Sequence, residues 1–174
     1  MTAGAIVLIG PMGAGKTSIG RRVAKALEVP FFDTDAAVTG AHGAIETIFA
    51  EHGEARFRAL ERAAVVDGLA TDGVVSLGGG AVLDPQTQRD LASHRVVLLT
   101  VAPRVVAHRV NGSKRPLLQG GDDAMARWSE IFAERRPVYD ALADVTFDTS
   151  SGPLQQVVDA IVAWARNPPT QGEA

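Results

Sequence analysis

The feature that most constrains the fold is a glycine-rich segment, Gly10-Pro11-Met12-Gly13-Ala14-Gly15-Lys16-Thr17. It fits the pattern G-x-x-x-x-G-K-[ST], with an apolar run before it and a helical apolar pattern over 19–27 after it. In this setting the glycines let backbone N–H groups turn around a phosphate, and the helix N-terminus adds a favourable dipole. The predicted nucleotide contacts are Gly13, Ala14, Gly15, Lys16, Thr17 and Ser18.

Short apolar runs alternate with longer stretches of helical period along the chain. Continuous apolarity, as opposed to alternation, is typical of parallel strands that are covered on both faces. The pattern therefore predicts a three-layer α/β/α sandwich around a five-stranded parallel sheet. The predicted strands lie at Ala5–Ile9, Pro30–Phe32, Val74–Leu77, Val96–Leu99 and Val145–Phe147, and Pro85 and Pro153 are predicted at first helical positions.

Length and composition narrow the class of protein. The chain has 174 residues, the size of one domain, and 46% of them are hydrophobic, enough for a full core. It has no cysteine, so neither a disulfide nor a thiolate metal site is possible. A net charge of −3 argues against a nucleic-acid partner, and no apolar run is long enough for a membrane span. We expect a cytoplasmic monomer with a frayed tail from about Arg166.

Two stretches interrupt the alternation. Residues 35–69 show helical periodicity with no strand, and residues 111–123 are polar, glycine-rich and basic. Inserts at the carboxyl ends of strands are where substrate sites and lids are built. The sequence therefore predicts a substrate-binding insert in the first stretch and a lid in the second.

Several polar residues close to these strand ends suggest chemistry, although each has a plainer interpretation. Asp33 and Asp35 end the second strand, where one could hold a magnesium-bound water and the other could accept a proton; alternatively Asp35 only caps the next helix. Arg58 and Glu61 are three residues apart and can pair, or they can form a solvated helix face. The glycines at 78–80 can expose N–H groups to a ligand, or form an ordinary loop.

Two arginine clusters and four histidines are the remaining candidates for functional residues. Arg115 lies in the predicted lid and can neutralise a transferring phosphoryl group, whereas Arg135 belongs to a second cluster; either arginine could equally be a surface residue. The histidines show no metal-ligand spacing. They are predicted to be surface or loop residues and are His42, His52, His94 and His108.

These fragments, in this order, resemble the shikimate kinase family over nearly the whole chain. The family pattern contains G-x-M-G-[AS]-G-K-[ST], D-x-D, F-R-x-x-E, G-G-G, R-P-L-L and R-x-P-x-Y. Here these motifs are matched at Gly10–Thr17, Asp33–Asp35, Phe57–Glu61, Gly78–Gly80, Arg115–Leu118 and Arg135–Tyr139.

The resemblance implies a nucleoside monophosphate kinase-like fold and ATP- and Mg²⁺-dependent phosphorylation of the 3-hydroxyl of shikimate, on the route to chorismate and aromatic amino acids. It implies that Asp35, Lys16 and Arg115 are catalytic, with Asp35 as the base. Arg58 and Arg135 would hold the substrate carboxylate. The other implied contacts are Gly79, Gly80, Phe49, Phe57 and Glu61 for shikimate, Arg109, Arg115 and Pro153 for the nucleotide, and Thr17, Asp33 and Ser76 for the metal.

The sequence also departs from the family pattern. The segment at 38–45 is one residue shorter than the corresponding segment of the family and lacks the glutamate that the family usually has there. Gly40 and Gly43 also weaken the helix expected in this segment. The adenine-side loop at 149–153 lacks an arginine, so a backbone contact is expected.

Two other functions stay open at this point. One is a kinase of the same build for gluconate or a nucleoside monophosphate. The other is a GTP-binding switch, which would need an N-K-x-D motif; the nearest match, Asn111–Lys114, lacks the aspartate.

Overall fold

The computed structural model describes residues 4–110 and 122–168, and its centre is a five-stranded parallel sheet. The strand order is β2-β3-β1-β4-β5, and every neighbouring pair is parallel. The predicted strands are confirmed to within two residues at each end. The strands are β1 (Ile6–Ile9), β2 (Phe31–Asp33), β3 (Val74–Ser76), β4 (Arg95–Thr100) and β5 (Val145–Asp148).

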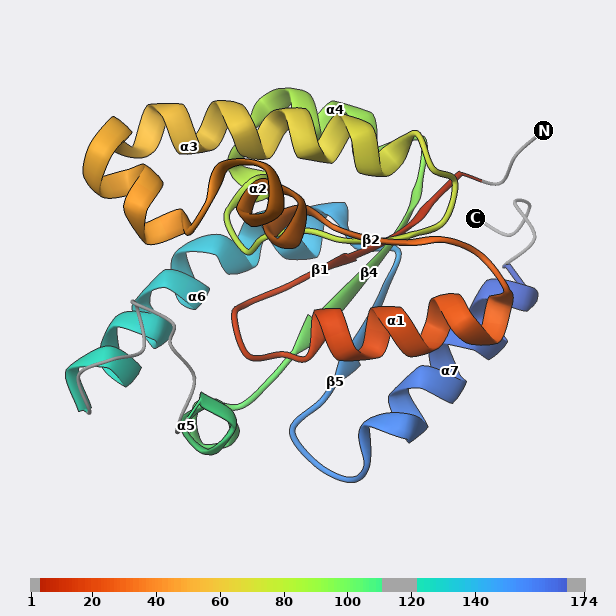
Figure 1. The fold of residues 1–174 in the computed structure, drawn as a ribbon. Coiled ribbons are helices and arrows are strands. Elements are labelled where there is room, and N and C mark those ends of the chain that lie inside the picture. The colour runs from red at the N-terminus through yellow and green to blue at the C-terminus, as the bar shows by residue number, and fades with distance from the viewer. Residues whose placement is uncertain (1–3, 111–121, 169–174) are drawn as a thin grey trace.

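Helices cover both faces of the sheet, as Figure 1 shows, so the predicted three-layer fold is confirmed. Alternate residues of β1 point to opposite faces, with Leu8 in the core beside α1 and α7 and Val7 in the core beside α3 and α6. The helices are α1 (Lys16–Leu27), α2 (Thr34–His42), α3 (Ile45–Leu69), the 3-10 turn η1 (Ala81–Leu83), α4 (Pro85–Leu91), α5 (Pro103–Val110), α6 (Asp122–Leu142) and α7 (Leu154–Arg166).

The first insert consists of α2 and α3, with no strand between them. Helix α2 forms in spite of Gly40 because both of its ends are capped. The Asp33 carboxylate accepts a hydrogen bond from Ala36 N at 3.0 Å, and Gly43, at φ 89°, ends the helix. The cap is therefore Asp33, and Asp35 lies in the first helical turn. Helix α3 bends at Gly53, whose φ is 79°.

The two predicted proline positions have different outcomes. Pro85 is the first residue of α4, and Asp84 caps that helix by accepting hydrogen bonds from Gln86 N and Thr87 N at 2.7 and 3.1 Å. The prediction for Pro153 was wrong by one residue: its ψ of 140° is extended, so it is the cap and α7 begins at Leu154.

Three earlier predictions fall wholly or partly outside the described residues. Arg115 and most of the predicted lid lie in 111–121, and the end of the tail lies in 169–174. Within the described ranges, none of the helices is long and apolar enough to cross a membrane.

Two helical glycines provide a test of how tightly the insert packs on the sheet. A Cβ atom on Gly68 of α3 would lie 2.8 Å from Phe32 Cδ1 and 3.0 Å from Val75 Cγ1, whereas one on Gly40 of α2 would meet nothing within 4 Å. We expect Gly68→Ala to lower the free energy of unfolding by about 1–3 kcal/mol through overpacking. Gly40→Ala, the matched control, should raise it by up to about 1 kcal/mol through helix propensity. Urea unfolding measures both changes, and shifts of the same sign would contradict this packing.

Candidate active site

The phosphate loop joins β1 to α1 and ends at the helix N-terminus, as the sequence predicts. Gly13 and Gly15 have φ values of 83° and 94°, a left-handed conformation that glycine adopts without strain. Lys16 is the first residue of α1, and its ammonium group lies over the loop. Nζ donates to the carbonyl oxygens of Gly10 at 2.8 Å and Pro11 at 3.0 Å. The loop amides, the lysine and the helix dipole therefore converge on one point.

Two oxygen-bearing side chains are in contact beside this loop, and a third belongs to the neighbouring strand. The Thr17 hydroxyl donates to Asp33 Oδ2 at 2.6 Å, and Asp33 is paired with Ser76 in the register of β2 and β3. Magnesium takes oxygen ligands, and in phosphoryl-transfer sites it uses one or two protein groups together with phosphates and water. This donor set fits that ion. No group of three or more His, Cys, Asp or Glu that could hold a metal occurs among the residues that the structure describes.

A cavity of about 170 Å³ lies next to the phosphate loop and brings together all eight predicted substrate contacts. The phosphate loop supplies Pro11 and Met12 to its wall, so a molecule in the cavity lies beside the predicted phosphate position. The predicted residues that line it are Asp35, Phe49, Phe57, Arg58, Glu61, Gly79, Gly80 and Arg135.

The Arg58 guanidinium is fixed by its neighbours. Nη1 donates to Glu61 Oε1 at 2.8 Å, and the Glu61 side chain is 5% exposed. A Cβ atom on Gly80 would lie 2.7 Å from Arg58 Nη1, so only glycine leaves room for the guanidinium to lie flat on the loop. The predicted pairing of Arg58 with Glu61 is confirmed as a contact, and the solvated-face alternative is wrong for Glu61.

The other two glycines of the loop make room for charged groups in the same way. A Cβ atom on Gly78 would lie 2.6 Å from Asp35 Oδ1 and 3.0 Å from Glu61 Oε2. One on Gly79 would lie 3.3 Å from Arg135 Nη1. Two guanidinium groups therefore lie against consecutive glycines. This arrangement suits a carboxylate ligand held by both.

The two residues predicted near adenine lie on the far side of the phosphate loop. Arg109 Nη1 donates to Gly13 O at 2.9 Å, and the guanidinium also donates to the hydroxyl and carbonyl oxygens of Thr149. The buried Thr149 hydroxyl in turn lies 2.9 Å from Ala14 O. Pro153 precedes Leu154, whose Cδ1 would lie 3.7 Å from a Cβ atom on Gly15. The loop at 149–153 thus lies against the phosphate loop.

Apart from Arg135, sequence reasoning missed the part of the cavity wall that α6 supplies. Trp128 Nε1 donates to Met12 O at 2.8 Å, and the Tyr139 hydroxyl donates to Gly79 O at 2.6 Å. Burial raises the pKa of Tyr139, so its phenol stays protonated and able to donate. The signal was the spacing of 128, 132, 135 and 139, which puts these residues on one helix face with Arg135. The missed lining residues are Pro11, Met12, Ile45, Gly78, Trp128, Ile131, Phe132 and Tyr139.

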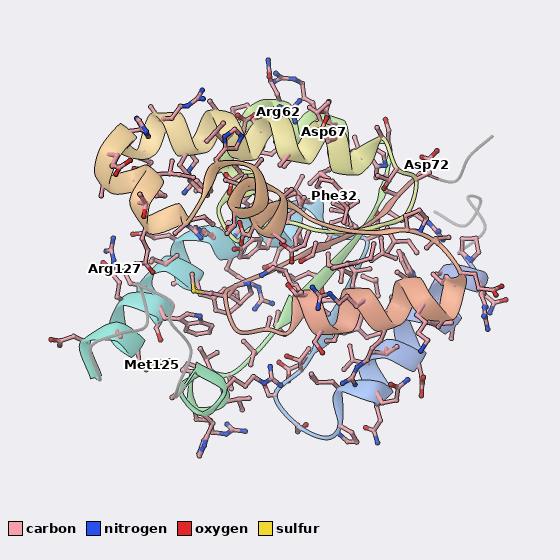
Figure 2. All side chains as sticks on the ribbon, in the orientation of Figure 1. Phe32, Arg62, Asp67, Asp72, Met125 and Arg127 are labelled. Carbon is pink, nitrogen blue, oxygen red and sulfur yellow. The ribbon has the colours of Figure 1, made fainter. Side chains whose placement is uncertain are left out.

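A second cavity, of about 270 Å³, lies on the other side of Arg58 and Gly80. Arg62, labelled on α3 in Figure 2, belongs to this second cavity and is held by Asp90 and Thr87 of α4. Although this cavity is larger, no residue of the phosphate loop lines it. We therefore place the acceptor in the smaller cavity.

The buried Glu61 carboxyl gives a pH dependence with a definite sign. Burial raises the pKa of Glu61 above 4.5, its ordinary value, against the opposing effect of Arg58. A raised folded-state pKa means that the native protein holds the proton more tightly than the unfolded chain does. Stability from this group is therefore fully present below about pH 4.5 and is lost as the pH rises through the folded-state pKa.

We expect Glu61→Gln, which cannot titrate, to remove this decline in the free energy of unfolding. Urea unfolding of both proteins across pH 4 to 8 would measure the difference. If the free energy of unfolding of the variant depends on pH as it does in the wild type, the decline does not come from Glu61.

The family of this chain follows from comparisons with known proteins. Residues 12–166 match the family model described as "Shikimate kinase". The shikimate kinase of Thermobifida fusca (strain YX) is 45% identical over 170 residues, covering 96% of each chain. That of Mycobacterium avium (strain 104) is 45% identical over 160 residues, covering 90% of each.

Solved structures agree with the sequence comparisons. A structure of shikimate kinase from Acinetobacter baumannii in complex with shikimate has a TM-score of 0.88 at 30% identity, covering 97% of this chain and 96% of that one. A gluconokinase from Sinorhizobium meliloti 1021 has a TM-score of 0.63 at 23% identity, which shows a shared fold alone. The family model and the shikimate kinase relatives lead to the same assignment. The chain belongs to the shikimate kinase family, enzymes that phosphorylate a hydroxyl of shikimate, as its motifs predict.

Proposed function

We propose that this protein transfers the γ-phosphoryl group of ATP to the 3-hydroxyl of shikimate. The observation that carries the proposal is the cavity in which Arg58 and Arg135 lie against consecutive glycines and to which the phosphate loop contributes Pro11 and Met12. A small acceptor whose carboxylate binds the two guanidiniums has its hydroxyl groups directed toward Asp35 and the loop. Bidentate pairing of arginine with carboxylate adds orientation as well as affinity.

Asp35 is the residue that receives the acceptor proton in this proposal. Its carboxylate lies beside Gly78, in the cavity wall, and the cap of α2 is made by Asp33 instead. The acceptor oxygen forms a bond to the γ-phosphorus while the bond between that phosphorus and the bridging oxygen of ADP breaks. The hydroxyl proton passes to Asp35, which also orients the hydroxyl for in-line attack.

Charge on the transferring group is balanced by groups that face the phosphate position. On the protein side, Lys16 and the amides of the phosphate loop supply the balancing positive charge. They need little reorganisation, because hydrogen bonds already hold the Lys16 ammonium group against the loop. Arg115 is proposed as a further contact from the lid and lies outside the described residues.

Magnesium would be held by Thr17 and, through water, by Asp33, with Ser76 beside them. When bound, the ion neutralises charge on the phosphate oxygens. The hydrogen bond of 2.6 Å between Thr17 and Asp33 keeps both oxygens at the mouth of the phosphate loop. Because Asp33 also caps α2, the same carboxylate ties the metal site to the helix that carries Asp35.

Two further sequence predictions, a monomer and a cytoplasmic protein, belong to this proposal and stay predictions. Both substrates proposed here are small molecules, and the predicted contacts for both come from one chain.

The acceptor assignment is tested by replacing Asp35 and Arg58. We expect Asp35→Asn to lower kcat by roughly 10²- to 10⁴-fold, the range for loss of a general base. Arg58→Ala should lower kcat/KM for shikimate by at least about 30-fold, since it breaks a buried charge contact. Coupled ADP release measures both, and ADP affinity should be unchanged because neither residue borders the predicted nucleotide contacts.

Arg62→Ala is the matched control, one helical turn from Arg58 but bound to Asp90 outside the acceptor cavity, and it should keep wild-type turnover. Gluconate and nucleoside monophosphates serve as control acceptors. Release of ADP with one of these and not with shikimate would overturn the acceptor assignment while leaving ATP binding intact.

The metal role of Asp33 is tested separately by Asp33→Asn. Asparagine still caps a helix, so α2 should persist, but the negative charge is removed. We expect the Mg²⁺ concentration for half-maximal activity to rise about 10-fold or more, since hydrogen bonds to charged groups contribute about 1.5–3 kcal/mol. Asp84→Asn is the control, a capping aspartate of α4 away from the phosphate loop. An unchanged Mg²⁺ requirement in Asp33→Asn would refute this role.

A further inference from the structure

One face of α6 carries a row of three aromatic side chains that forms a wall of the acceptor cavity. Trp128, Phe132 and Tyr139 all line this cavity. The ring centroids of Trp128 and Phe132 are 5.3 Å apart, and those of Phe132 and Tyr139 are 6.2 Å apart. Both pairs are tilted, with interplanar angles of 42° and 40°, and both centroid distances lie in the range of interacting aromatic pairs. The row is therefore a continuous, packed unit.

The two ends of this aromatic row bind the two loops between which phosphoryl transfer takes place. Trp128 Nε1 donates to Met12 O of the phosphate loop, and the Tyr139 hydroxyl donates to Gly79 O of the glycine loop after β3. Trp128 is 4% exposed and Tyr139 0% exposed, so both donor side chains are buried, while the two hydrogen bonds themselves are partly buried. Each carbonyl loses its hydrogen-bond donor if its loop moves away from α6, so these two bonds restrain both loops.

The row also connects the two halves of the core. Trp128 belongs to the core beside α1 and α7, Tyr139 to the core beside α3, and Phe132 packs against both. Packed interiors transmit displacement because they have few voids to absorb it. The row therefore forms a continuous packed path between the two loops.

We propose that Trp128 and Tyr139 are positioning residues that, with Phe132 between them, set the distance between the phosphate loop and the acceptor site. In-line transfer needs the reacting atoms about 3–3.5 Å apart, and a misplacement of about 1 Å can lower the rate about 100-fold. The phosphate loop follows β1 and the glycine loop follows β3, and the two loops lie close together, since a Cβ atom on Gly79 would lie 3.6 Å from Gly10 O. The aromatic row is a further restraint between them. Neither residue touches the reacting atoms in this proposal.

The kinetic test uses Tyr139→Phe and Trp128→Phe, which keep a ring and remove one hydrogen-bond donor each. The kinetic part rests on the proposed function, because it measures shikimate-dependent ADP release. Each variant should lose between about 10- and 100-fold in kcat, with KM for ATP little changed. Because the Tyr139 hydroxyl also interacts with Arg135, KM for shikimate should rise in Tyr139→Phe and stay little changed in Trp128→Phe. The double variant should lose less than the product of the two single losses, because breaking one end already releases the row.

The control is Trp164→Phe, which alters the other tryptophan of the chain, on α7 beside Arg95, and should keep wild-type kcat. Wild-type kcat in Tyr139→Phe would overturn the proposal. A loss of kcat in the double variant equal to the product of the two single losses would also overturn it. A fall in Tm with kcat unchanged would show a purely structural role and would also overturn it. Tyr139→Phe is nearly isosteric, so it keeps the test valid if Trp128→Phe fails to fold.

A second measurement does not depend on turnover. Backbone amide hydrogen exchange is followed in the phosphate loop and in residues 78–81 of the substrate-free protein. Removing the bond at either end should accelerate exchange in both loops by roughly 10-fold, since local opening governs exchange. Acceleration confined to the loop whose bond was removed would overturn the proposal. Absence of shikimate-dependent turnover in the wild type would instead refute the proposed function, and the exchange result would still decide this inference.

Discussion

The parallel alignment of the five strands is the constraint on which the rest of the structure depends. With the order β2-β3-β1-β4-β5 and every pair parallel, all strands reach their carboxyl ends at one edge of the sheet. The loops after β1, β2 and β3 therefore lie side by side there: the phosphate loop, the Asp33–Asp35 segment and the glycine loop. Residues that are distant in the chain become neighbours because the sheet brings their strands together, the general rule for open parallel sheets.

The glycine loop explains how so many charges fit at this edge. Two carboxylates, of Asp35 and Glu61, and two guanidiniums, of Arg58 and Arg135, face one small cavity. Side chains on residues 78–80 would occupy the space of these groups. Glycine thus serves here through its missing Cβ atom more than through its backbone freedom. The result is a preorganised set of charges, whose burial is offset by pairing such as that of Arg58 with Glu61.

Much of this architecture was predictable because the signals are local. Runs such as Val96–Leu99 are continuously apolar, which identifies strands covered on both faces, and Asp84-Pro85 marks a helix start by cap chemistry. Errors came where two local signals compete. Pro153 could be either the cap or the first helical residue, and its extended ψ made it the cap. At the start of α2 the sequence left capping by Asp35 open only as an alternative, and that alternative is wrong because Asp33 makes the capping bond to Ala36 N.

The sequence alone determined the phosphate loop, the sheet and the family, because each depends on short patterns with a direct physical cause. A glycine-rich turn between strand and helix, continuous apolar runs and ordered motifs need no knowledge of distant contacts. Only the tertiary structure decided what closes the cavity. Trp128, Phe132 and Tyr139 look in sequence like ordinary core residues of an amphipathic helix. Their contact with Met12 and Gly79, 116 and 60 residues away along the chain, arises only when the sheet brings those loops against α6.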